Sequence, residues 1–293
     1  MACITHCLRD LTCQSDDPGL SSYAFFYWAK HFQEVLATGE RDLLIGRLVN
    51  FIVELCQKAP RGLETWPSTY FVTRYEIEFG LNPCLMVVWL DLMELYPHVQ
   101  HLHEPGGCVQ HNALHIAAYM ENERAIDMLM DSDPQTCIST IVNARDRAGE
   151  TPLMVACRFS RTGVVPRLLC YPSIDLHTVN YKGETGLHLA CRNGHLAIVQ
   201  ALLTHPSHPP IDVSASDRWG RTALHHASQE YLNIVELLLG HPRPTPLNLN
   251  ALMDQRGRTP LHYAALSYED PVDIVQALLN YPSQPPVDLN ATD

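Results

Sequence analysis

The histidines are the residues of this chain that could most readily do chemistry, because imidazole binds metal ions and exchanges protons near neutral pH. There are sixteen of them among 293 residues. The densest group offers nitrogen and sulfur ligands for zinc and comprises His98, His101, His103, Cys108 and His111. Its spacing matches none of the regular patterns of zinc sites, so we expect no bound metal.

The local signatures of known catalytic sites are missing from the sequence. Neither G-x-S-x-G nor H-E-x-x-H occurs, so no nucleophile or metal-dependent hydrolase centre is indicated. The phosphate-binding pattern G-x-x-x-x-G-K-[ST] is also missing, since the glycine pair Gly106-Gly107 is followed by Cys108 and Val109. The sequence therefore predicts a protein that is not an enzyme, has no catalytic residues and uses no cofactor.

Four other histidines, His115, His188, His225 and His262, stand at the fourth position of a motif of six residues that recurs along the chain. The motif positions are Asn112–Ala117, Thr151–Ala156, Thr185–Ala190, Thr222–Ala227 and Thr259–Ala264. The leucine at the third position of each motif is followed by the next after 39, 34, 37 and 37 residues. A period in this range indicates an array of supersecondary units, each of which buries its apolar face against its neighbours.

These motifs resemble ankyrin repeats. The family pattern T-P-L-H-x-A is complete at Thr259–Ala264, and a second apolar helix pattern follows each motif, as at Ile198–Leu203. The resemblance covers residues 109–293 and implies an all-α ankyrin-repeat solenoid of about five helix-turn-helix units with β-hairpin tips. It also implies that the motif Thr and His are hydrogen-bonded, in the pairs Thr185/His188, Thr222/His225 and Thr259/His262.

The first third of the chain differs from the repeats. Residues 1–78 are expected to form a small helical domain, with the aromatic cluster Tyr23–Trp28 as its packing face. Residues 79–108 are expected to hold a divergent first repeat, in which Pro83 matches the motif proline, and a connection. Segments Cys7–Leu11 and Tyr23–His31 resemble the helical region between the NTPase and the ankyrin array of fungal NACHT–ankyrin proteins of the STAND type. That resemblance implies an NTPase module before residue 1, which this chain lacks.

The last residues resemble the entry to a further hairpin. Val287–Asp293 correspond to segments that precede earlier hairpins, and no polar capping repeat follows them. We therefore expect an uncapped last repeat, either because the chain is shorter than its relatives or because a partner covers the exposed face.

Composition favours a soluble protein of a reducing compartment. The ten cysteines are scattered, and Cys157 and Cys191 stand at small-residue positions of the repeats, which is typical of buried free thiols. The first residues show no basic region followed by an apolar run, so we expect no signal peptide, and no apolar stretch is long enough to predict a membrane span. A formal net charge of −12 argues against nucleic-acid binding. We expect a cytoplasmic location, with the nucleus as the alternative, and no membrane partner.

Binding remains as the function, and the repeat register indicates where it would occur. Each hairpin tip follows a D-x-x-G pattern, with Asn180 in place of Asp in one of them. In ankyrin arrays the variable tip residues and those after the first helix line the concave face, which here comprises Arg147, Glu150, Arg158, Phe159, Tyr181, Lys182, Glu184, Arg192, Asn193, Arg218, Trp219, Arg221, Gln229, Glu230, Gln255, Arg256 and Arg258. Eight of these seventeen residues are basic and three are acidic.

This charge predicts a partner protein with an acidic segment, rather than a small-molecule substrate. Tyr181 and Trp219 would act as aromatic anchors. The predicted partner-binding residues are Arg147, Arg158, Tyr181, Lys182, Arg192, Arg218, Trp219, Arg221, Arg256 and Arg258. Alanine at Trp219 and Arg221 is expected to weaken binding with little loss of thermal stability. The function predicted is a protein-interaction scaffold or recognition module, and the alternative is an ankyrin-type regulator of transcription or signalling that sequesters a partner.

Overall fold

The computed structural model describes residues 109–131, 142–146, 148–206, 210–242, 247–267, 271–282 and 286–288. It divides the chain into two compact units, residues 1–132 and 133–293. The predicted segments 1–78 and 79–108 lie outside the described residues, as do Arg147, His98 to Cys108 and the side chain of His111. The domain boundaries and the uncapped end therefore stay predictions.

The described part of the first unit is a pair of helices, α7 (Val109–Met120) and α8 (Glu123–Asp131). Leu114 on α7 and Ile126 on α8 are completely buried. The backbone between the helices turns at Glu121, which has a φ of 58°. The side chain of Asn122 then accepts a hydrogen bond from the Ala125 amide at 2.9 Å, which caps the start of α8.

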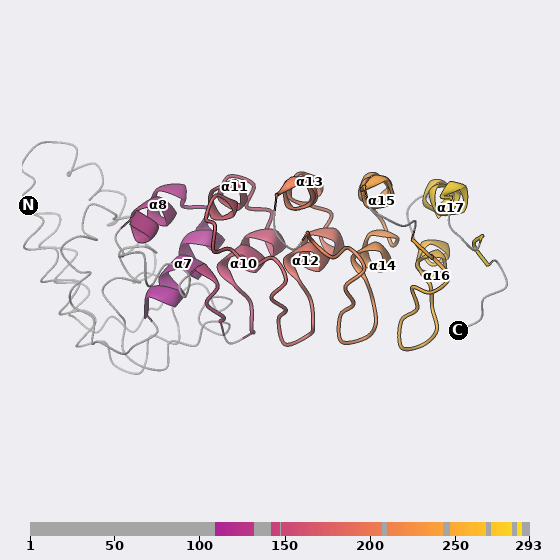
Figure 1. The fold of residues 1–293 in the computed structure, drawn as a ribbon, viewed down its shortest axis with the longest axis horizontal. Helices are drawn as coiled ribbons and strands as arrows, with labels where there is room; N and C mark the ends of the chain where they lie inside the picture. Colours follow the sequence, from indigo (N-terminus) through magenta and orange to yellow (C-terminus); the bar gives the residue numbers. More distant parts are fainter. Residues whose placement is uncertain are drawn as a thin grey trace, which may run out of the picture. The chain divides into compact units, whose positions relative to one another are not determined.

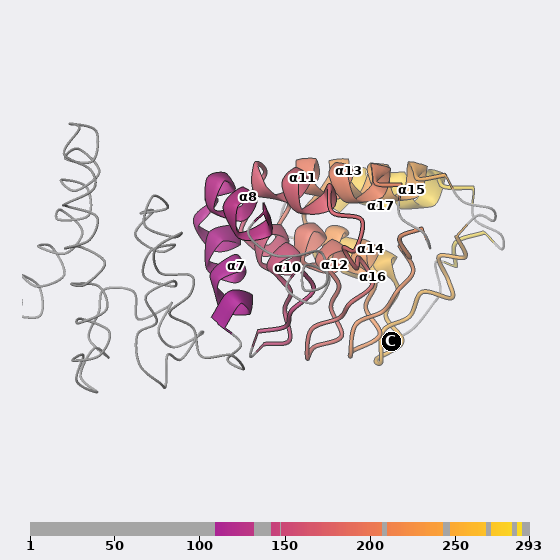
Figure 2. The ribbon, with the colours of Figure 1, turned by 60° about the vertical axis from the view of Figure 1, so that its left-hand side comes forward.

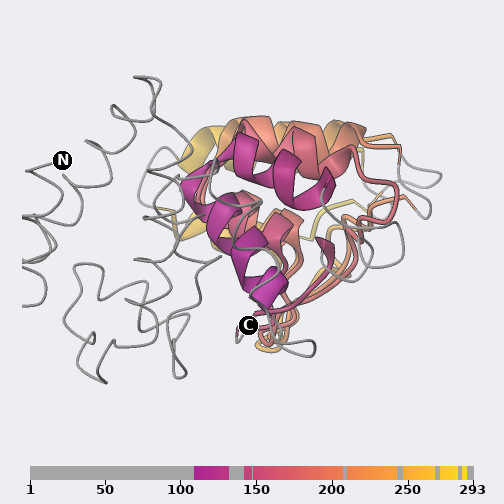
Figure 3. The same ribbon diagram turned by 90° about the vertical axis from the view of Figure 1, so that its left-hand side faces the viewer.

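The described part of the second unit contains four helix pairs. They are α10 (Pro152–Arg158) with α11 (Val164–Leu169), α12 (Gly186–Arg192) with α13 (Leu196–Thr204), α14 (Ala223–Ala227) with α15 (Leu232–Gly240), and α16 (Pro260–Ala265) with α17 (Pro271–Asn280). The first helices of the pairs form one layer and the second helices another (Figure 1). The same two layers are visible from the side and end-on, with the loops that precede the first helices projecting to one side (Figures 2 and 3).

The first helix of each pair begins at the motif threonine. Thr151, Thr185, Thr222 and Thr259 all have extended backbone angles at the N-cap position. In α12 the Thr185 hydroxyl and the N3 residue His188 form a reciprocal capping box. Small residues near the ends of these helices, such as Cys157 in α10 and Cys191 in α12, are completely buried, so neighbouring repeats can approach closely. Both are free thiols, as expected, and burial raises the pKa of each well above its usual value.

The tips between the repeats are tight turns. The Asp217 amide donates to the Arg221 carbonyl at 2.8 Å and the Gly220 amide to the Asp217 carbonyl at 3.0 Å. The tip glycines, Gly220 included, have φ near 75–79°, a conformation that glycine adopts without strain. Ser216 and Thr222 form an isolated antiparallel bridge, and the described residues contain no strand. The all-α solenoid is confirmed, but the expected β-hairpins are reduced to turns.

Successive tips are joined in register by backbone hydrogen bonds. The amides of Tyr181, Arg218 and Gln255 donate to the carbonyls of Ala148, Lys182 and Trp219, at 3.1, 2.8 and 2.8 Å. Each bond links one tip to the tip before it. Variable tip residues from different repeats are therefore held in a row. None of the described helices is both long and apolar enough to cross a membrane.

Candidate partner-binding site

The exposed tip residues of three consecutive repeats form a surface that we call the tip row. It comprises Tyr181, Lys182, Arg218, Trp219, Gln255 and Arg256. Lys182, Arg218 and Arg256 are exposed, and their side chains make no ion pair or hydrogen bond within the described part of the chain. These three cations are therefore available to a ligand, one from each tip.

Two aromatic side chains stand beside these cations. The Tyr181 ring is 60% exposed and the Trp219 ring 42% exposed, which is unusual for such large apolar groups. The guanidinium of Arg145 lies 5.5 Å from the Tyr181 ring centre, and that of Arg221 lies 4.6 Å from the Trp219 ring centre. Cation–π contacts at these distances hold the rings in place without covering them.

Two of the other predicted basic residues have partners inside their own repeats. Arg158 pairs with Glu150, and Arg192 pairs with Glu184. Both glutamates are buried, at 1% and 0% exposure, so the expectation that they line an accessible face is wrong. Asn180 also donates to a Glu184 carboxylate oxygen at 2.9 Å. Burying a carboxylate is costly unless it is paired, and these arginines provide the pairing.

In the later repeats, arginines neutralise buried aspartates instead of buried glutamates. Arg221 contacts Asp217 at 2.8 Å and Arg258 contacts Asp254 at 2.8 Å, and both aspartate side chains are buried. Burial alone would raise the pKa of Asp254, but hydrogen bonds from the Arg258 amide, the Tyr263 hydroxyl and the Arg258 side chain lower it well below its usual value.

Four of the eight predicted basic residues, Arg158, Arg192, Arg221 and Arg258, therefore neutralise buried carboxylates. Their role in partner binding stays a prediction. Removal of Arg221 would leave the Asp217 carboxylate without its main partner. We therefore expect the Arg221 substitution to lower stability, so it cannot serve as a neutral binding test.

The expected Thr–His pairs are confirmed in the repeats. Nδ1 of His188, His225 and His262 lies 2.8, 3.0 and 3.0 Å from the hydroxyl of Thr185, Thr222 and Thr259, respectively. Nδ1 also accepts from the threonine amide in each case, at 3.2, 3.0 and 3.1 Å. His225 reaches the next repeat as well, because its Nε2 lies 3.2 Å from the Arg258 carbonyl. All three histidines cap their helices, and His225 also links two repeats.

A buried cluster at the seam between two repeats has the donor types of a metal site. One ligand atom from each of Glu184, Asp217 and His226 lies within 4.8 Å of the others. Glutamate, aspartate and histidine are all zinc ligands. The carboxylates, however, already accept hydrogen bonds from Arg192 and Arg221, and Nε2 of His226 lies 3.3 Å from Asp217 Oδ2. The groups therefore satisfy one another, and the arrangement serves as a polar network between repeats.

This network predicts a loss of stability in mild acid. Burial, with Arg221 and His188 nearby, lowers the pKa of His226 to about 4, and burial lowers that of His225 to about 4. Between pH 6.5 and 4 the unfolded chain therefore binds protons that the folded chain excludes, so the free energy of unfolding falls as pH falls. His226→Gln, which keeps an N–H donor near Asp217 and cannot titrate, should reduce this slope by up to about 1.4 kcal/mol per pH unit. Urea unfolding at pH 7, 6 and 5 measures how the free energy of unfolding depends on pH in the unmodified protein and in His226→Gln. Equal slopes for the two proteins would contradict the prediction.

Sequence reasoning missed the ion pairs, although the spacing contained a signal. Glu150/Arg158 and Glu184/Arg192 share a separation of eight residues, and Asp217/Arg221 and Asp254/Arg258 share one of four. When the same separation between a carboxylate and an arginine recurs in successive repeats, it indicates an ion pair. Burial of the carboxylate then distinguishes this ion pair from a solvated pair on the surface.

Comparison with known families agrees with this architecture. The family model of ankyrin repeats matches the chain in three copies, at residues 92–180, 161–248 and 216–293. The first copy begins inside the segment expected to hold a divergent repeat. No curated protein matches the chain. Ankyrin repeats generally mediate protein–protein interaction and are typically not catalytic. Since the matched copies span well over half of the sequence, the chain belongs to the ankyrin-repeat family.

Proposed function

We propose that this protein is a non-catalytic recognition module or scaffold that binds an acidic segment of a partner protein along the tip row. The observation that supports this is one exposed cation on each of three consecutive tips, Lys182, Arg218 and Arg256, none of which pairs with another residue of the described ranges. Such cations bind carboxylates or phosphates through charge-assisted hydrogen bonds.

The arrangement compensates for the weakness of single surface charges. An exposed ion pair contributes only about 0.2–1 kcal/mol, so one tip alone would bind poorly. Backbone hydrogen bonds between tips fix the positions of successive cations before the partner arrives. A preorganised row loses less entropy on binding than a flexible one. Tyr181 and Trp219 add apolar area between the charges, and both types are enriched at binding hot spots.

The same surface fits two biological roles. One is the sensor arm of a signalling system, as the resemblance to NACHT–ankyrin proteins implies, and the other is sequestration of a regulator of transcription or signalling. We favour a cytoplasmic protein partner over nucleic acid, a membrane or a small molecule, because the chain has a net charge of −12.

The test removes charge from the tip row without disturbing the fold. Lys182→Gln/Arg218→Gln/Arg256→Gln should weaken binding of a fluorescent twelve-residue polyglutamate peptide by about tenfold or more, because three ion pairs are lost. Fluorescence anisotropy at low salt measures the affinity. The stability should change by less than about 0.5 kcal/mol, since these side chains have no ion pair or hydrogen bond with any residue that the structure describes.

The matched control keeps each charge and exchanges the side chain that carries it. Lys182→Arg/Arg218→Lys/Arg256→Lys should retain affinity within about threefold, because exposed charge and not shape determines the interaction. Trp219→Ala should weaken binding with no change in its salt dependence. Equal affinity of the charge-removing and charge-keeping variants for the polyglutamate peptide would refute a role of the tip row in the binding of acidic segments.

A further inference from the structure

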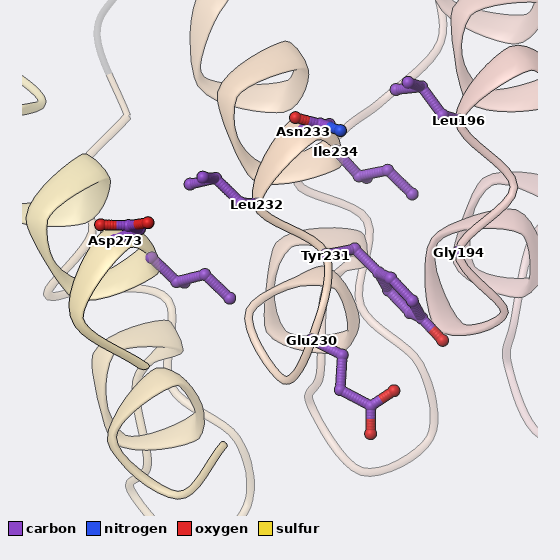
Figure 4. Close-up of a pocket in the computed structure, with 9 residues that line it drawn as sticks. Gly194, Leu196, Glu230, Tyr231, Leu232, Asn233, Ile234 and Asp273 are labelled. Carbon is purple, nitrogen blue, oxygen red and sulfur yellow. The ribbon is translucent and has the colours of Figure 1, made fainter. Parts of the chain in front are cut away.

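A second surface lies at the loops between the paired helices, and we call it the loop groove. It has a volume of about 380 Å³ and is lined by residues from three successive repeats. Figure 4 shows the first turn of α15 between the turn at Gly194 and the start of α17. The lining residues are Gly194, Leu196, Glu230, Tyr231, Leu232, Asn233, Ile234, Asp273 and Ile274.

The floor of the loop groove is apolar. Ile234 and Ile274 are almost completely buried, at 1% and 2% exposure, and Leu196 and Leu232 are partly exposed above them. Tyr231 points toward the turn at Gly194 (Figure 4). A Cβ at Gly194 would lie 2.5 Å from Cε1 of the Tyr231 ring, so the glycine leaves the space that the ring occupies. The accessible apolar surface of the groove therefore comes from Leu196 and Leu232, against which one apolar side chain can pack.

The rim carries negative charge that no described residue neutralises. Glu230 and Asp273 are exposed, and neither carboxylate has an ion-pair partner within the described part of the chain. This contrasts with Glu150, Glu184, Asp217 and Asp254, each of which has its own arginine. None of the described residues that line the groove is a lysine or an arginine.

We propose that the loop groove binds a short basic and apolar segment of a partner protein, with one apolar side chain on the floor and lysine or arginine side chains beside Glu230 and Asp273. Long basic side chains suit such a site, because their methylene stems cover apolar surface while their charged ends stay in water. An arginine can also stack on the Tyr231 ring. The charge required is opposite to that expected for the tip row, so the two surfaces recognise different segments and this inference is independent of the proposed function.

The experiment titrates the full ¹⁵N-labelled chain with the peptide acetyl-Gly-Arg-Leu-Arg-Gly-amide at low salt. We expect saturable changes in the amide signals of Leu232, Asn233 and Asp273, because these residues line the groove. Glu230→Gln/Asp273→Asn should weaken the binding at least about fivefold, since it removes both rim charges and preserves shape. Glu236→Gln, which removes an exposed charge from α15 outside the groove, should leave the affinity unchanged.

Two further peptides separate charge from apolar contact. A version with glutamate in place of arginine should not bind the groove, and one with serine in place of leucine should bind more weakly. The proposal is overturned if the arginine and glutamate peptides bind alike, if the signals that move lie outside the groove, if Glu236→Gln weakens binding as much as the rim variant, or if nothing saturates at millimolar peptide. Because the rim variant leaves the tip row intact, its binding of polyglutamate reports separately on the proposed function.

Discussion

Replacement of Arg192 by alanine is expected to lower the free energy of unfolding by about 3 kcal/mol, because it leaves a buried carboxylate unpaired. Glu184 has 0% exposure, and besides Arg192 its carboxylate accepts a hydrogen bond from the neutral amide of Asn180. Arg192 is 27% exposed, so water can replace part of its contribution, which places the effect at the lower end of the range for buried pairs. Urea unfolding followed by circular dichroism measures the loss.

Two further variants show whether the ion pair is the cause. Arg218→Ala removes an exposed cation whose side chain has no partner among the described residues, and it should change stability by less than about 0.5 kcal/mol. In a Glu184→Gln background, in which Arg192 no longer has a buried carboxylate to neutralise at position 184, Arg192→Ala should cost about 1 kcal/mol or less. An equal cost of Arg192→Ala in both backgrounds would show that the side chain acts through packing and not through its charge.

Replacement of Gly183 by alanine is expected to cost about 2–4 kcal/mol, from an unfavourable backbone conformation together with a steric clash. Gly183 has a φ of +75°, a backbone conformation that residues other than glycine rarely adopt. An added Cβ would lie 2.7 Å from the amide nitrogen of Arg218 and 3.1 Å from the carbonyl carbon of Asp217. Both are backbone atoms, so no side-chain rotation relieves the contact.

The clash lies where two neighbouring tips meet. The Arg218 amide donates to the Lys182 carbonyl at 2.8 Å, and displacement of that backbone should break this bond. Hydrogen exchange at the Arg218 amide should therefore become faster in Gly183→Ala. Gly240→Ala is the matched control, because a Cβ at Gly240 meets nothing within 4 Å. It should be neutral or stabilising by up to about 1 kcal/mol, and similar losses for both variants would contradict the explanation.

The fold could be predicted from the sequence because its determinants are local and repeated. Thr and His stand at the same positions of three motifs, and the same helix cap forms in each of the three. The period of the motif leucines predicted the stacking, and the buried Leu187 and Leu224 confirm which face of the helix packs. The pairing that the β-hairpin tips were expected to form is limited, among the described residues, to one bridge between Ser216 and Thr222.

The candidate site was only partly predictable. Repeat register placed Trp219 and Arg218 on the exposed tips, and they are exposed. Register alone could not separate these residues from Arg192 and Arg221, which belong to ion pairs. The type of a residue does not reveal whether its charge is already compensated, because that depends on which carboxylate the fold buries beside it.

The sequence by itself determined the repeat unit, its caps and the order of the helices, since each of these follows from neighbours within one motif. Only the tertiary structure decided which charges face solvent and which are enclosed between repeats. The seam of Glu184, Asp217 and His226 joins two repeats, and the loop groove joins three. Their chemistry depends on distances between segments more than thirty residues apart in the chain, and stacking of the repeats sets those distances.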